Sequence, residues 1–146
     1  MTKPIPPRTP SALKLHITQA EWEQLYKNGL IQAKVKGTAK ELDPFPVVKL
    51  FYPAGNGTWL LSEVEPDEPE IAWGVADLGM GFPEFGAVSL QELAEFKGFA
   101  GLRIERDRFF KAKAPISRYI EAAHSAGQIV ESLPDTALSK RRSDEP

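Results

Sequence analysis

Apolar residues recur at helical spacing in three stretches of the chain, and each stretch has a recognisable start. The capping boxes Thr18-Gln19-Ala20-Glu21 and Ser89-Leu90-Gln91-Glu92 predict two helix N-termini, because each hydroxyl accepts a backbone N–H and each glutamate reaches back. We expect Gly29 to end the first of these helices, and the second to be short. A third helix is expected to begin at Pro115, a residue suited to the first helical position, and to end near Gly127.

Between the helices, β-branched and aromatic residues form short runs separated by turn residues. The runs 47–52, 58–64 and 71–78 are joined by Gly- and Pro-containing turns, and a fourth run, 102–107, alternates at first between apolar and charged residues. Connections this short favour antiparallel pairing. The sequence therefore predicts an α+β fold, in which an antiparallel β-meander sheet packs with helices near both ends of the chain.

The 146 residues are expected to form one domain with loose ends. Residues 1–12 contain four prolines and are predicted to be a flexible tail, 13–132 a single α+β domain, and 133–146 a second flexible tail. Within that last stretch, Lys140, Arg141 and Arg142 are either a nucleic-acid contact or a solvated basic run, and the two acids that follow favour the second interpretation.

Several kinds of chemistry are disfavoured by composition. The chain has no cysteine, and its two histidines, His16 and His124, do not have the spacing of metal ligands, so we expect neither a metal site nor a cofactor. No Gly-x-Ser-x-Gly motif occurs. No apolar run is long enough to span a bilayer and the first ten residues do not resemble a secretion signal, so a cytoplasmic location is expected.

The net charge of −2 hides a strong segregation of charge along the sequence. Residues 50–96 contain nine Asp or Glu and no Lys or Arg, whereas residues 97–118 contain seven Lys or Arg and two acids. Two interpretations stay open. The acidic segment pairs with the basic strand, or it leaves an acidic surface that attracts a basic partner.

The acidic segment contains the most concentrated candidate site, at the end of the third run. Asp77 is followed by a glycine-rich loop with Gly79 and Gly81, and then by a second carboxylate, Glu84. The loop is a poor match to a phosphate-binding motif, because no helix follows directly. It is either a rigid loop with Phe82 and Phe85 packed inward or a binding site for a ligand or partner.

Glu63 is a further candidate for this binding site. Simple alternation places it on the same sheet face as Trp59 and Leu61. If strand register brought it to Asp77, the two carboxylates would be suited to acid–base chemistry; the alternative is that both lie at strand ends in water. We expect Trp59 and Trp73 to be core residues.

Arg103, Arg106 and Arg108 are candidates for a basic contact. Arginines bind phosphate or carboxylate in a bidentate manner, but Glu105 and Asp107 lie between them and favour internal pairing. The neighbouring Phe109 and Phe110 are predicted to be core residues, because no aromatic–basic repeat surrounds them.

Several of these motifs together resemble a known family. The runs 47–51 and 58–63, the glycine-rich loop 77–86, the capping box at 88–93 and the segment 104–107 are similar to a bacterial domain-of-unknown-function family, over roughly residues 46–130. Its members are small proteins frequently encoded on plasmids, phages and integrative elements. The resemblance implies a bacterial, cytoplasmic protein associated with mobile elements, and it carries over no activity and no catalytic residues.

Three functions follow as expectations. The first is a non-enzymatic binding module of a bacterial mobile element, which engages a protein partner such as a nucleic-acid-binding protein through its acidic surface and so modulates a nucleic-acid-handling or host-defence complex. The second is a small carboxylate- or metal-assisted enzyme acting on a nucleotide or nucleic acid near Asp77 and Glu84. The third is direct nucleic-acid binding by residues 97–118. Partner identity and oligomeric state are left open by the sequence.

Overall fold

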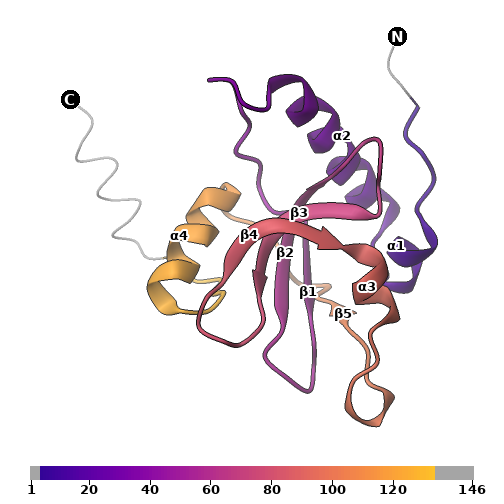
Figure 1. Cartoon of the computed structure of the whole chain (residues 1–146), viewed down its shortest axis with the longest axis vertical. Coiled ribbons are helices and arrows are strands. Elements are labelled where there is room, and N and C mark those ends of the chain that lie inside the picture. Colours follow the sequence, from indigo (N-terminus) through magenta and orange to yellow (C-terminus); the bar gives the residue numbers. More distant parts are fainter. Residues whose placement is uncertain (1–3, 134–146) are drawn as a thin grey trace.

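A computed structural model describes residues 4–133 (Figure 1), and it contains two elements that the sequence pattern did not predict, the helix at Pro10–Lys14 and the strand at Glu84–Ser89. In chain order the elements are α1 (Pro10–Lys14), α2 (Gln19–Val35), β1 (Val48–Phe51), β2 (Thr58–Val64), β3 (Ile71–Asp77), β4 (Glu84–Ser89), α3 (Leu90–Glu95), the 3-10 turn η1 (Phe99–Gly101), β5 (Glu105–Arg106) and α4 (Ile116–Ala126). Both predicted capping hydroxyls, of Thr18 and Ser89, accept a backbone N–H as expected.

The strands form one antiparallel sheet in the order β4-β3-β2-β1-β5. The predicted α+β fold with an antiparallel meander is therefore confirmed. The strand β5 is much shorter than the predicted run 102–107, because only Glu105 and Arg106 pair with β1. Before them, the chain makes the turn η1 and Arg103 donates to the Ala94 carbonyl at the end of α3, at 3.0 Å.

The sheet is the middle of three layers, and alternate residues of β2 pack into different cores. Leu61 belongs to the larger core, which α1, α2 and α3 cover, whereas Leu60 contacts Tyr119 of α4 in the smaller core. Figure 1 shows α4 on one side of the sheet and α1 and α2 on the other. Both faces of the central strands are therefore buried, which explains why β2 reads as a nearly continuous apolar run.

A β-bulge in β2 changes which face the end of the strand presents. Leu61 pairs with Gly74 but Glu63 pairs with Trp73, so Ser62 is the extra residue. The bulge keeps Val64 in the same core as Leu61 and turns Glu63 to the opposite face. The expectation that Glu63 shares a face with Leu61 is therefore wrong.

Helix α2 packs against the bulge so closely that it needs a glycine. It continues to Val35 instead of ending at Gly29, because a Cβ atom at position 29 would lie only 1.9 Å from the Val64 carbonyl oxygen. One residue earlier, Asn28 Nδ2 donates to the Ser62 carbonyl, at 2.9 Å. Gly29 therefore marks a close helix–strand contact and not a helix end.

Ordered structure begins before residue 13, the expected end of the N-terminal tail. Thr9 caps α1, Ala12 is fully buried, and the Trp22 indole N–H donates to the Pro6 carbonyl at 3.0 Å. Pro10 suits the first turn of a helix, where its missing N–H costs nothing. Residues 1–3 and 134–146, with most of the expected C-terminal tail and Lys140–Arg142, lie outside the described part of the chain.

The Gly29 contact makes a first prediction. Gly29→Ala should lower the free energy of unfolding by about 1–3 kcal/mol through overpacking, although the same change in an open helix raises it by roughly 1 kcal/mol. Gly86→Ala is the control, because a Cβ there meets no atom within 4 Å. Urea denaturation measures both, and a Gly29→Ala protein more stable than the parent would contradict the contact.

Candidate functional site

The carboxylate of Asp77 holds two distant segments together. Its Oδ1 accepts a hydrogen bond from the Gly79 N–H and its Oδ2 one from the Ile129 N–H, both at 2.9 Å. Asp77 is 4% exposed. With both oxygens engaged by backbone, its role here is to fix the loop and the segment after α4.

The loop that follows Asp77 presents apolar side chains to solvent. Gly79 and Gly81 have positive φ angles of 80° and 84°, which L side chains rarely adopt. The side chains between and after them face outward: Met80 is 70% exposed and Phe82 81%. The expectation that Phe82 packs inward is wrong. Phe85, 44% exposed, instead stacks on Trp73 with ring centroids 6.0 Å apart.

The candidate carboxylates do not converge. Glu84 pairs with Ala76, the neighbour of Asp77, so Glu84 and Asp77 point to opposite faces of the sheet. Glu63 shares a face with Asp77 but pairs with Trp73, four residues along β3, a separation of ~13 Å. Within residues 4–133, no three His, Asp or Glu side chains are placed to hold a metal ion. The geometry does not support acid–base work by these pairs.

Glu63 is nevertheless the most unusual ionisable group of the structure. Its residue is 8% exposed, and its carboxylate forms no ion pair with a described residue. The pKa of Glu63 is raised from 4.5 to about 7, chiefly by burial and also by the charges of Glu65 and Glu41, while Lys36 opposes the shift. Near neutral pH this group therefore exchanges a proton easily.

Aromatic and charged side chains surround Glu63 on the same sheet face. Trp73 pairs directly with it, and the indole N–H of Trp73 donates to Glu65 Oε1 at 2.6 Å. The ammonium of Lys36, just after α2, lies 4.5 Å from the centroid of the Trp73 ring. We call Lys36, Glu63, Glu65, Trp73 and Phe85 the Glu63–Trp73 site. Two carboxylates and an aromatic face are the groups that bind an organic cation.

The nine acids of residues 50–96 are not neutralised by the basic strand. Four ion pairs are formed within residues 4–133: Lys49–Asp107, Lys49–Glu131, Arg106–Glu21 and Arg118–Glu121. None of them includes an acid of that segment. The sheet order explains this, because β4 and β5 lie at opposite edges.

Three of the four arginines of residues 97–118 meet at one cavity. Arg103, Arg106 and Arg108 line it together with Lys14 and His16. Internal pairing with Glu105 and Asp107 was expected but is not found: Arg106 contacts Glu21, and Asp107 contacts Lys49.

The two phenylalanines that follow differ from each other. Phe109 was expected in the core but is 83% exposed. Phe110 is partly buried against Tyr119, with ring centroids 6.2 Å apart.

The sequence was compared with known protein families, and one family model matches it. The family model described as "Protein of unknown function (DUF2958)" matches residues 16–130. The chain belongs to the DUF2958 family. No curated protein and no solved structure matches the sequence significantly. Across residues 4–133 of this DUF2958 protein, no helix has the length and apolar character needed to cross a membrane.

Sequence reasoning missed three contributors to these sites. Lys36 and Lys14 carry no local signal, because their contacts depend on how α2 and α1 pack. Trp73 was expected in the core, yet it is only partly buried. The position of Glu63 depends on the bulge at Ser62, and no glycine or proline in β2 predicts this bulge from the sequence.

The raised pKa of Glu63 predicts how stability depends on pH. The folded protein binds this proton more tightly than the unfolded chain, so the contribution of Glu63 to stability is present below pH 4.5 and is lost as pH rises through about 7. Between pH 5 and 8, the parent should lose about 2 kcal/mol more of unfolding free energy than Glu63→Gln. Urea denaturation at both values measures the difference. Parallel pH profiles for parent and variant would refute the assignment, and Glu68→Gln, at an exposed position, is the control.

Proposed function

We propose that this DUF2958 protein is a non-enzymatic binding module that docks a cationic segment of a partner protein at the Glu63–Trp73 site. The observation that carries the proposal is the position of Glu63, which is only 8% exposed and forms no ion pair with a described residue. A buried unpaired carboxylate costs stability. A partner's lysine or arginine that reached Glu63 and Glu65 would supply the missing charge.

Lys36 supports this choice of ligand. Its ammonium already lies over the face of Trp73, so the ring accepts a cation in this geometry. Lys36 is an exposed side chain and can be displaced at little cost. An incoming lysine would take its place over the ring, with the carboxylates of Glu63 and Glu65 beside it.

Long-range charge favours the same partner. The turn between β2 and β3 carries the exposed acids Asp67 and Glu68, and a surface of one sign steers an oppositely charged partner and raises its rate of association. A basic, DNA-binding surface of another protein has the matching chemistry.

The setting is part of the proposal. The motifs of the chain resemble those of small proteins carried on bacterial mobile elements, so the partner we propose belongs to a nucleic-acid-handling or host-defence complex in the bacterial cytoplasm. By covering a basic surface, the module would keep that partner from DNA.

The proposal predicts a specific pattern of binding to a hexalysine peptide that is acetylated only at its N-terminus and keeps all six side-chain charges. At pH 8, where Glu63 is ionised, Glu63→Gln should raise the dissociation constant at least fivefold and Glu68→Gln, with the same change of charge, less than twofold. Lys36→Gln should lower the dissociation constant, because it removes the internal competitor. Calorimetry gives the affinities, and the indole N–H resonance of Trp73 reports the site.

Binding measured at a second pH distinguishes a specific contribution of Glu63 from a general effect of net charge. At pH 6 Glu63 is mostly protonated, so parent and Glu63→Gln should bind with similar affinity. Equal effects of Glu63→Gln and Glu68→Gln at pH 8, or weaker binding by Lys36→Gln, would overturn the proposal.

A further inference from the structure

A basic cavity at the other edge of the sheet is independent of the Glu63–Trp73 site. Its volume is about 580 Å³, and its charged lining consists of Lys14, His16, Arg103, Glu105, Arg106 and Arg108. This volume falls in the range of ligand pockets, roughly 300–1,000 Å³. Four permanent cations face one carboxylate there, so the natural ligand is an anion.

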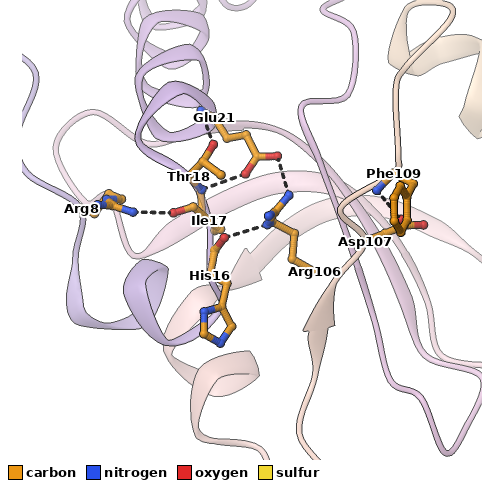
Figure 2. A network of polar contacts seen from close by, with 8 residues as sticks. All are labelled: Arg8, His16, Ile17, Thr18, Glu21, Arg106, Asp107 and Phe109. Atoms are coloured by element: carbon orange, nitrogen blue, oxygen red, sulfur yellow. Dashed lines mark hydrogen bonds and ion pairs between the residues drawn. The ribbon is translucent and has the colours of Figure 1, made fainter.

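The floor of the cavity is fixed by the turn between α1 and α2 (Figure 2). His16 has a φ angle of +60°, and its carbonyl oxygen accepts a hydrogen bond from Arg106 Nε at 2.7 Å. The same guanidinium lies 3.4 Å from Glu21 Oε2. On the other side of the turn, Arg8 donates to the Ile17 carbonyl at 3.1 Å. A left-handed histidine is costly, and strained residues of this kind cluster at functional sites.

Two of the cations are left for a ligand. Lys14 and Arg108 form neither an ion pair nor a side-chain hydrogen bond within residues 4–133, and both are exposed. Arg103 uses one nitrogen on the Ala94 carbonyl and keeps its other donors. Arg106, which Glu21 partly neutralises, holds the wall in place.

Two exposed aromatic residues are close in sequence to the cavity lining, since Phe99 is two residues before Gly101 and Phe109 directly follows Arg108. Phe99 is 82% exposed and Phe109 is 83% exposed, and the guanidinium of Arg108 lies 5.3 Å from the centroid of the Phe109 ring. The loop that carries Phe99 is anchored, because the Tyr52 hydroxyl accepts its backbone N–H at 2.9 Å and Gly98 lies against the Tyr52 ring. Rings left in water on anchored segments are suited to stacking on flat ligands.

We propose that this cavity binds single-stranded nucleic acid. A backbone phosphate lies among Lys14, Arg103 and Arg108, and neighbouring bases stack on Phe99 and Phe109. Cationic grooves with exposed aromatic rings are how proteins hold unpaired strands, since every base offers a flat face. A duplex hides those faces, so single strands are preferred.

The test uses fluorescence anisotropy of the full chain with labelled dT12 at 50 mM salt, with a salt series. Lys14→Gln/Arg108→Gln should weaken binding at least tenfold, and Phe109→Ser at least fivefold. Lys140→Gln/Arg141→Gln removes the same two residue types elsewhere and should change affinity less than threefold. Thermal melting checks that each variant folds, which is expected because Lys14, Arg108 and Phe109 are exposed.

A failure of dT12 to bind would overturn the proposal, and so would any of three further results. The first is that the Lys140→Gln/Arg141→Gln pair loses as much affinity as the cavity pair. The second is that a duplex of equal length binds more tightly than the single strand. The third is that inorganic polyphosphate competes as well as dT12 and Phe109→Ser has no effect, which would indicate a phosphate site without base stacking. None of these outcomes depends on whether hexalysine binds at the Glu63–Trp73 site.

Discussion

The contact between α2 and the bulge of β2 is the constraint from which both the packing and the Glu63–Trp73 site follow. Asn28 donates to the Ser62 carbonyl and Gly29 lets the helix reach the Val64 carbonyl. The extra residue in β2 lets Leu61 and Val64 both enter the helix-covered core, while Glu63 turns to the other face. A charged group therefore lies in the middle of an otherwise apolar strand because the helix requires this register.

The order of the strands separates the two signs of charge. Had β5 paired with β4, arginines would lie beside the carboxylates of the hairpin, and cross-strand pairs would neutralise both. It pairs with β1 instead, at the far edge. Like charges gathered on one surface repel one another and destabilise the folded state, and proteins tolerate this where the electrostatic field helps to recognise a partner. The two binding sites that we propose, one for a cation and one for an anion, follow this separation of charge.

The parts of the fold that local chemistry determines were predictable, and the parts that depend on contacts between distant segments were not. Capping hydroxyls at Thr18 and Ser89 located two helices, and turn residues located three strands of the meander, whereas β4 was not predicted because its residues follow a glycine-rich loop directly. Gly29 misled, because a glycine at a helix end and a glycine at a close contact look alike in sequence. The three arginines were identified as a group, but Lys14 and His16 join them only because the turn after α1 packs against β5.

One carboxylate links motions of segments that are far apart in the chain. Asp77 holds the glycine-rich loop through one oxygen and the backbone at Ile129 through the other. When thermal fluctuation moves the Asp77 side chain away, both hydrogen bonds break together, because one carboxylate accepts both amides. The amides of Gly79 and Ile129 should therefore open to solvent as one cooperative unit, so that the apolar loop tip and the chain beyond α4 share a single local unfolding equilibrium.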